Sequence, residues 1–412
     1  MRYLLFYISV YNFIFPIRLT FIPKSELLIF AIPLLWFLIN LNKFKSILNY
    51  KRYKTSFYYV VILILFGTLS SLLNNGDYMS LTIFFKFFFS IILSTSIILW
   101  GINLYGDRFF ETLLSIIIIS GFIISLTNLI EFFHPPFRFF LLKTIEVTGN
   151  TDYEMSFRTH GFASSGGSSL SLGILITSIL SFLKFKMSKN KTKKLALYLM
   201  FLFLYISTLV IGRTGFFVGI PIVLYFLFFE GISFSGFFKK TFSVFAILIT
   251  LTQIISIIAE DDLNILYKYG LEPIFNYVEN GSFESRSSTA VVKMYYIPDI
   301  MHLIFGAGFW RWPTHGYDLS DVGYMKMLMS TGIFGVIFFY SYQVIIYKEA
   351  FSFYVKKYDL KVVFLFLFLV LFIVEFKESV FTQNYGSKLL ILLIVFSWIE
   401  KAKTKRKLEC VE

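Results

Sequence analysis

Cysteine is nearly absent from this chain, whose single example, Cys410, stands at the end of 412 residues. A lone cysteine leaves no pair for a disulfide and no cluster for a cysteine metal site. Charged residues make up only 15% of the chain and histidines number four, whereas 57% of residues are hydrophobic and 21% are aromatic. A soluble domain of this size could not cover so much apolar surface. The composition therefore indicates an integral membrane protein.

Long polar stretches are also lacking, and apolar runs of roughly 16–25 residues recur along the chain, as transmembrane helices require. We expect one all-α domain over residues 1–412, a polytopic helical bundle with about twelve spans. Prolines interrupt the first two runs, so a re-entrant hairpin is an alternative there. The expected spans are 3–20, 26–41, 57–74, 81–104, 112–133, 166–185, 195–211, 215–230, 242–259, 322–346, 362–380 and 388–400.

Lysine is unevenly distributed between the loops. Alternate loops are lysine-rich, and the others hold scattered cations roughly balanced by acids; the rich segments are 43–54, 186–194, 239–240, 348–361 and 401–407. The positive-inside rule places the lysine-rich loops and both termini in the cytoplasm. The two longest lysine-poor loops, about 134–165 and 260–321, are then periplasmic. The net charge of +13 is mainly a topology signal, and we expect no nucleic-acid partner.

Three arginine segments stand out on the expected outer side. Arg213 lies in the tight turn Ile211-Gly-Arg-Thr-Gly215, and Arg158 and Arg286 lie in the two outer loops. A cation at the membrane edge costs free energy unless it has a partner. An anionic, lipid-borne substrate would supply that partner, because guanidinium binds phosphate through two parallel hydrogen bonds. Anchoring to lipid headgroups is the alternative reading of each arginine.

A series of short motifs follows in a fixed order: Gly212-Arg-Thr-Gly215, Glu284-Ser-Arg-Ser-Ser288, Ile304-Phe-Gly-Ala-Gly308, Ser320-Asp-Val-Gly-Tyr324 and Ser330-Thr-Gly-Ile-Phe-Gly335. This order resembles the O-antigen polymerase and ligase superfamily, Wzy-type polymerases in particular. An earlier segment, Arg158-Thr-His-Gly161, is similar to the arginine-containing third outer loop of that family. The resemblance covers residues 155–345 by motif and the whole chain by topology.

The resemblance implies a GT-C-like glycosyltransferase with a large outer loop between spans 9 and 10. Such enzymes join oligosaccharides carried on undecaprenyl diphosphate into O-antigen or capsule-type polysaccharide, at the periplasmic face of the bacterial inner membrane. It further implies membrane lipid and a chain-length regulator protein as partners. Ligases of the superfamily usually carry a histidine where Ser320-Asp321 stands here, and the nearest histidine, His315, lies six residues upstream of Asp321. This departure favours polymerase over ligase.

Cleavage of a glycosyl diphosphate develops negative charge on the diphosphate, and the acceptor hydroxyl needs a base. We expect Asp321 or His315 to serve as that base, with Arg286 at the reacting diphosphate; Asp318 and Glu284 are further candidates for the base. Asp321 could instead cap the helix that begins at Val322. The expected substrate-binding residues are Arg158, His160, Arg213, Arg311 and Tyr324.

Two other features have open readings. Trp310 and Trp312 beside Arg311 suit either interfacial anchoring or stacking on sugars. Lys86 lies inside an apolar run, from where it can snorkel to the surface.

Asp261-Asp262 lacks histidines or further acids at ligand spacing. We therefore expect neither a metal nor a cofactor.

The rival functional class is a transporter, because twelve spans with both ends inside is also a carrier arrangement. A flippase for the same lipid-linked sugars would need cationic residues too. The halves of the chain show no internal repeat, which many carriers have. The polar residues also collect in outer loops rather than at mid-membrane. Both features favour the glycosyltransferase over the flippase, and ligation of finished chains is the third alternative.

Overall fold

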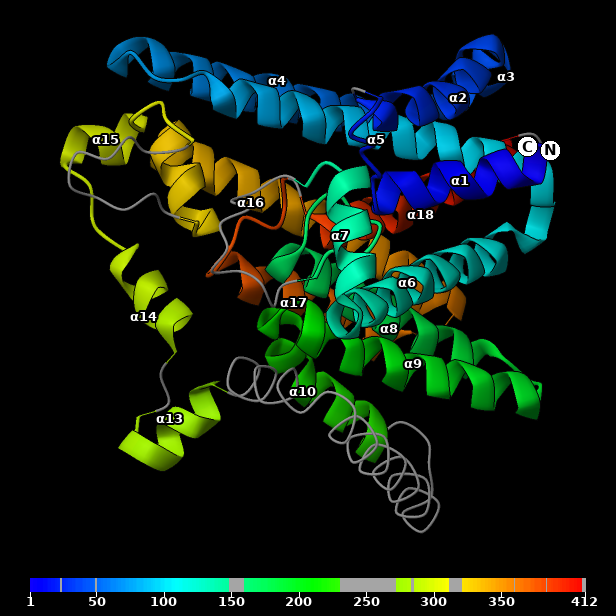
Figure 1. The fold of residues 1–412 in the computed structure, drawn as a ribbon. Helices are drawn as coiled ribbons and strands as arrows, with labels where there is room; N and C mark the ends of the chain where they lie inside the picture. The colour runs from blue at the N-terminus through cyan, green and yellow to red at the C-terminus, as the bar shows by residue number, and fades with distance from the viewer. Residues whose placement is uncertain are drawn as a thin grey trace.

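The computed structural model describes residues 1–22, 24–48, 50–147, 159–229, 272–282, 285–310, 321–358, 360–382 and 384–409. Within these ranges the regular elements are helices (Figure 1). Outside the helices, Leu19 and Ile145 form one isolated antiparallel bridge. Five helical segments are long and apolar enough to cross a membrane. The predicted class, an all-helical membrane protein, is confirmed at this level. The count of twelve spans and the GT-C class stay predictions.

Each expected span outside 242–259, which lies beyond the described residues, coincides with a helix. The helices at these positions are α1 (Arg2–Ile14), α2 (Ser25–Ile39), α4 (Lys51–Asn74), α5 (Met79–Tyr105), α6 (Phe109–Phe133), α8 (Gly167–Met187), α9 (Lys191–Ile211), α10 (Arg213–Phe229), α16 (Gly323–Tyr358), α17 (Lys361–Glu375) and α18 (Tyr385–Glu409). The sequence did not predict the short helices α3 (Leu41–Leu48), α7 (Pro135–Thr144), α13 (Glu272–Asn280) and α14 (Arg286–Lys293).

Two of these helices end earlier than expected. The first ends at Ile14 rather than near residue 20, because Pro16 has no N–H for a further helical bond and Asn12 Oδ1 accepts from the backbone N–H of Ile17 at 2.9 Å. The helix α17 ends at Glu375 rather than near residue 380, because the Glu375 carboxylate accepts hydrogen bonds from the backbone that follows. Each early end leaves an irregular segment inside the bundle.

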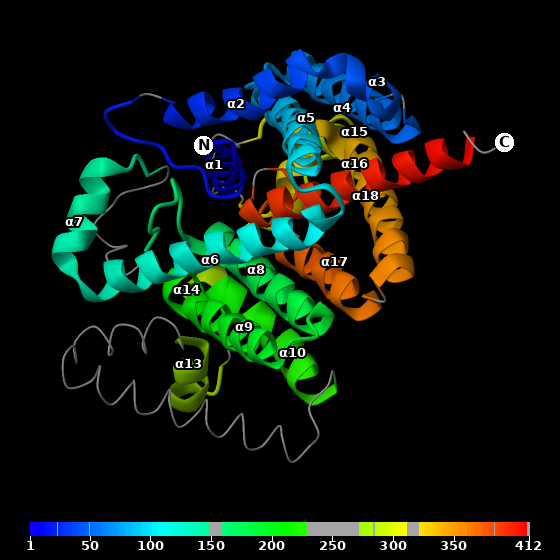
Figure 2. The same cartoon turned by 90° about the vertical axis from the view of Figure 1, so that its right-hand side faces the viewer.

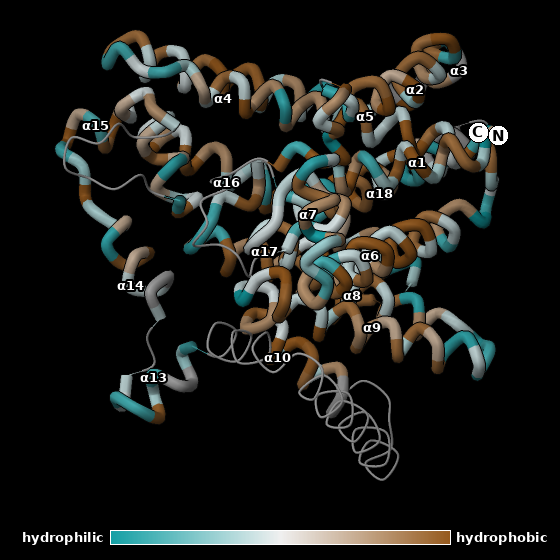
Figure 3. Tube along the Cα trace, viewed as in Figure 1, coloured by the Kyte–Doolittle hydropathy of each residue, from teal (hydrophilic) through white to brown (hydrophobic). Residues whose placement is uncertain are grey.

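The helix α8 is the centre of the bundle, where it packs against α6, α9, α10 and α18 (Figure 2). Its residues from Leu170 to Leu183 are all buried. Hydrophobic residues colour most of the helices along their lengths, and hydrophilic residues gather at helix ends, for example at the start of α9 (Figure 3). This distribution fits a bundle whose middle is apolar on all sides.

The segments predicted to lie on the outer face meet at one end of the bundle. The peptide N–H of Ser164 donates to the carbonyl of Pro16 at 3.0 Å, and that of Asp77 donates to Gly308 at 3.1 Å. The Lys377 ammonium donates to the Thr214 hydroxyl at 2.8 Å. These contacts bring several of the lysine-poor connections together at this end.

A break in α16 ties the segment before this helix to this end of the bundle. Gly332 has φ +71°, a conformation that favours glycine, and it interrupts the helical hydrogen bonds. The Met329 carbonyl instead accepts from the backbone N–H groups of Ala307 and Gly308, at 2.6 and 3.0 Å. The preceding helix α15 (Ile300–Phe305) has only six residues, shorter than the amphipathic helix expected over 297–305. The Gly-Ala-Gly motif thus joins the outer loop to α16.

Candidate functional site

A cavity of about 810 Å³ opens at the end of the bundle where these connections meet. Charged, hydroxyl-bearing and apolar side chains share its wall. Its described lining holds six cations, Arg18, Lys86, Arg213, Lys326, Lys377 and Lys388, and three carboxylates, Glu26, Asp321 and Glu378. Six positive against three negative charges leave a formal excess of three positive charges. A cavity at the end of an apolar bundle with such an excess favours an anionic ligand.

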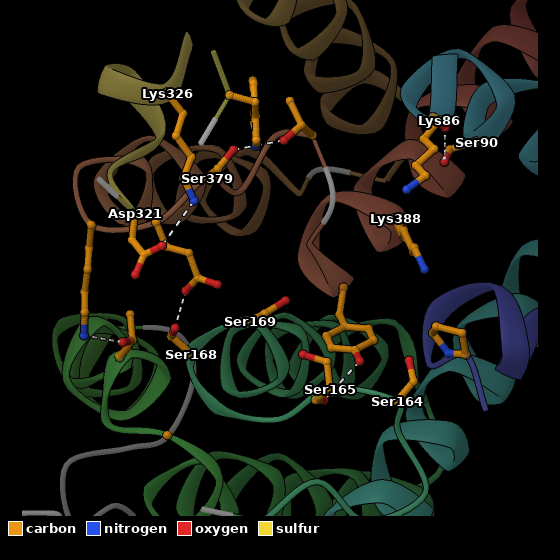
Figure 4. A pocket seen from close by; sticks show the side chains of 18 of the residues that line it. Lys86, Ser90, Ser164, Ser165, Ser168, Ser169, Asp321, Lys326, Ser379 and Lys388 are labelled. Carbon is orange, nitrogen blue, oxygen red and sulfur yellow. Dashed lines mark hydrogen bonds and ion pairs between the residues drawn. The ribbon is translucent and has the colours of Figure 1, made fainter. Parts of the chain in front are cut away.

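The charged residues form two groups, which we name by their positions. The α16–α17 group comprises Arg213, Asp321, Lys326, Lys377 and Glu378, and the α5–α18 group comprises Arg18, Glu26, Lys86 and Lys388. Asp321 and Lys326 lie on one side of the cavity and Lys86 and Lys388 on the other (Figure 4). Between them lies the start of α8, with a series of hydroxyls from Ser164, Ser165, Ser168 and Ser169.

Arg213 is the first residue of α10, and Gly212 alone separates it from Ile211, where α9 ends. This tight connection requires Gly212, because a Cβ there would lie 2.8 Å from the backbone of Gly167 at the start of α8. The Arg213 guanidinium forms an ion pair with Glu272 of α13. The α13 segment of the large loop is thereby attached to the mouth of the cavity.

Asp321 and Glu378 bring two carboxylates to the same group. The Lys326 ammonium lies 3.2 Å from the Asp321 carboxylate, with 16% of the lysine side chain and 71% of the aspartate side chain exposed. Glu378, in the connection after α17, accepts a hydrogen bond from the Ser168 hydroxyl. Burial raises the pKa of Glu378, and the Asp321 charge raises it further, against the lowering effects of Ser168, Lys377 and Lys326. A carboxylate with a raised pKa is a stronger base.

The turn that carries Lys377 and Glu378 is held by a buried carboxylate. Glu375, which is 1% exposed, accepts from the Tyr340 hydroxyl at 2.7 Å and from the backbone N–H groups of Val380 and Phe381 at 2.7 and 3.2 Å. These bonds occupy both oxygens of the Glu375 carboxylate. Glu375 therefore positions Lys377 and Glu378.

The α5–α18 group combines charge with an apolar wall. The Arg18 Nε atom lies 2.8 Å from Glu26 Oε1. Lys86 lines the cavity from α5 one turn before Ser90, whose hydroxyl donates to the Lys86 carbonyl at 2.8 Å. Next to these charges the cavity wall is apolar, with Phe13, Leu27, Phe30, Phe89 and Leu93.

The structure separates the predicted site residues. Asp321 and Arg213 line the cavity. Arg158, Arg311 and His315 lie outside the described residues. Arg286 begins α14 after the Ser285 cap, and its side chain is also outside the description. No contact or distance in the structure therefore bears on the roles predicted for these four side chains.

His160 is not among the residues that line the cavity. It is buried against α6, where its ring Nε2 lies 3.5 Å from Glu131 Oε1. The other Glu131 oxygen accepts from the backbone N–H groups of His160 and Gly161, at 2.9 and 2.7 Å. These contacts fasten the segment that leads into α8.

Tyr324 is likewise directed away from the cavity lining. Its ring packs against Tyr340 and Phe376, at centroid distances of 4.8 and 4.7 Å. Its hydroxyl donates to the Phe372 carbonyl at 3.2 Å. Asp321, for its part, pairs with Lys326, and the helix begins at Gly323.

Sequence reasoning missed most of the cavity's charged residues. Lys86 was given a snorkelling role, and Lys388, Lys326 and Arg18 were not selected, because each is a single cation near the end of an apolar run. One signal was available: Lys86 and Ser90 are four residues apart, on one face of an otherwise apolar helix. The described ranges contain no group of three or more histidine, cysteine or acidic residues arranged to hold a metal ion.

Comparison of the chain with protein-family models, with curated proteins and with solved structures found no match.

Proposed function

We propose that this protein is a polysaccharide polymerase that joins oligosaccharide repeat units carried on undecaprenyl diphosphate, at the periplasmic face of the bacterial inner membrane. The observation that carries the proposal is the composition of the cavity wall, in which six cations adjoin an apolar surface. Such a wall suits an amphiphile with an anionic headgroup, because it can pair the charge and cover the hydrocarbon. The order of motifs, similar to that of Wzy-type polymerases, gives the substrate class.

The α16–α17 group suits the diphosphate of the donor. Arg213, Lys326 and Lys377 bring three cations to a confined space in which charge interactions are stronger than in water. Their positive charge would stabilise the charge that develops on the leaving diphosphate. The hydroxyls at the start of α8 add neutral hydrogen-bonding groups for a sugar.

The chemical step is a single displacement. The acceptor hydroxyl oxygen attacks the anomeric carbon of the donor glycan and forms the new glycosidic bond. The bond from that carbon to the diphosphate oxygen breaks, and its electron pair leaves with undecaprenyl diphosphate. Glu378, enclosed and next to Asp321, takes the hydroxyl proton. The transition state is oxocarbenium-like, so one displacement inverts the anomeric configuration.

The proposal needs the cavity on the periplasmic side. Reporter fusions at Lys191 and at the C-terminus should report cytoplasm, and a fusion at Gly281 should report periplasm, in accordance with the lysine distribution. A cytoplasmic Gly281 would put the α13 segment, and with it Arg213, on the wrong side for this reaction.

The direct test uses purified full-length protein in detergent with a repeat unit linked to undecaprenyl diphosphate. We expect a ladder of longer lipid-linked glycans and one released undecaprenyl diphosphate per bond formed. Transfer only to a second kind of acceptor would identify a ligase. Movement of the intact lipid across a vesicle membrane, with no new glycosidic bond, would identify a flippase. Either result would reject the polymerase.

A further inference from the structure

We infer that Arg18, Lys86 and Lys388 form a second anion subsite, which binds the phosphate groups of the acceptor lipid while the donor diphosphate occupies the α16–α17 group. This inference rests on the proposed function and adds to it a place for the second substrate. The three cations come from separate parts of the chain: the connection after α1, the middle of α5 and the start of α18. Lys86 and Lys388 point into the same side of the cavity (Figure 4).

The charges of this subsite are not balanced by the protein. Glu26 is its only carboxylate in the described lining, and Glu26 is paired with Arg18. Neither Lys86 nor Lys388 has an ion pair with a described carboxylate. Arg18 and Glu26 are the charged groups that act on the Lys388 ammonium. Two further cations at the edge of an apolar bundle cost free energy, which a bound anion would offset.

The neighbouring wall favours a lipid as the source of that anion. Leu27 and Phe89 line the cavity and are 50% and 40% exposed. Phe30 of α2 and Leu93 of α5 extend the same apolar wall. A prenyl chain could lie against these side chains while its phosphates reach Lys86 and Lys388. Free phosphate or diphosphate shares the headgroup chemistry but would gain nothing from the apolar wall.

The arrangement of the two groups matches the two substrates of a polymerase. The donor's anomeric carbon is bonded directly to its diphosphate, so the base must lie close to the donor diphosphate. The acceptor's reacting hydroxyl, in contrast, is separated from its own diphosphate by the sugars of a repeat unit. Asp321 and Lys326 lie across the cavity from Lys86 and Lys388 (Figure 4). The acceptor headgroup therefore fits the α5–α18 group, and its sugars would extend toward Glu378.

The test measures binding, so that it does not depend on turnover. Native mass spectrometry of the full-length protein in detergent would count bound undecaprenyl diphosphate, and titration would give Kd values. We expect two lipids on the wild type and one on Lys86→Gln or Lys388→Gln. The Kd of the second lipid should rise at least about tenfold in each variant, since hydrogen bonds to charged groups are strong. Lys86→Arg should retain two lipids, because it keeps the charge.

Lys143→Gln is the matched control. Lys143 lies in the last turn of α7, over the Phe139 ring, and is not among the residues that line the cavity. This control should bind two lipids. Two lipids with unchanged affinity on both Lys86→Gln and Lys388→Gln would overturn the subsite and leave the polymerase intact. No binding of undecaprenyl diphosphate to the wild type would overturn both. Inorganic diphosphate bound as tightly as the lipid would assign the subsite to free phosphate and overturn the acceptor role.

Discussion

Replacement of Gly332 by alanine should destabilise the whole outer end of the bundle. Gly332 has φ +71°, and a Cβ at this position would lie 2.1 Å from the Ile304 carbonyl oxygen and 2.8 Å from the Gly306 backbone nitrogen. These neighbours are backbone atoms, which cannot rotate away as a side chain would. The clash can be relieved only if the segment 304–308 moves away from α16.

The size of the effect follows from what that movement breaks. A left-handed conformation costs a non-glycine residue about 1–2 kcal/mol. Separation also breaks the bonds from Ala307 and Gly308 to the Met329 carbonyl, each contributing about 1 kcal/mol. We therefore expect Gly332→Ala to lower the free energy of unfolding by about 3–4 kcal/mol.

Gly281→Ala is the matched control for this prediction. Gly281 has φ +70°, almost the same as Gly332, but nothing lies within 4 Å of its would-be Cβ. This variant should therefore lose only the conformational part, about 1–2 kcal/mol. Thermal unfolding in detergent, followed by tryptophan fluorescence, would compare both variants with the wild type. Equal losses from Gly332→Ala and Gly281→Ala would refute the contact between the Gly-Ala-Gly motif and the break in α16.

Three further predictions concern the site. Arg213→Ala should reduce polymerisation more than about tenfold. Arg213→Lys should restore little of the activity, because a lysine ammonium is a point charge and lacks the planar guanidinium of arginine. A normal glycan ladder from the alanine variant would remove Arg213 from the donor site. Glu378→Gln should reduce the rate by about 10²–10⁴-fold, and Asp321→Asn by less. The base must be deprotonated to act, so wild-type activity should fall as the pH drops through the raised pKa of Glu378. The midpoint of this fall should therefore lie above the ordinary glutamate value of 4.5. The same fall in the residual activity of Glu378→Gln would assign this pH dependence to another group. His160→Ala should lower the melting temperature through loss of the Glu131 contact, with polymerisation per folded molecule retained; a stable but inactive variant would return His160 to the substrate site.

The helices were the predictable part of the structure. Long apolar runs determine where a chain can cross a membrane, and they need no knowledge of neighbouring helices. The expected run 195–211 ends with α9 at Ile211, and Arg213 follows in a one-residue connection. The ends of α1 and α17 were less predictable, because they depend on Asn12 and Glu375 binding nearby backbone groups. For α1 the sequence carries a signal in Pro16, whereas the effect of Glu375 depends on how the backbone after α17 folds back.

The sequence indicated that cations would form the site, but it did not indicate which residues line the cavity. Arginine in the turn before α10 drew attention in the sequence, and Arg213 does line the cavity. Lys86 and Lys388 are more than 300 residues apart in the sequence, and only the packing of the bundle brings both to one cavity. For His160, the structure shows a contact that the sequence did not predict. A histidine in a motif suggested substrate binding, but the buried carboxylate of Glu131, 29 residues earlier on α6, holds it in the fold.

The glycine motifs and the cavity charges have different physical roles, although both act at the same end of the bundle. The Gly308 carbonyl accepts hydrogen bonds from the Ser71 hydroxyl at 3.2 Å and from the Asp77 backbone at 3.1 Å, and two residues later Trp310 forms part of the cavity wall. The break at Gly332 therefore acts on the cavity through the position of Trp310. It follows that Gly332→Ala should lose stability and activity together, whereas Lys86→Gln should lose only the second bound lipid while the fold persists.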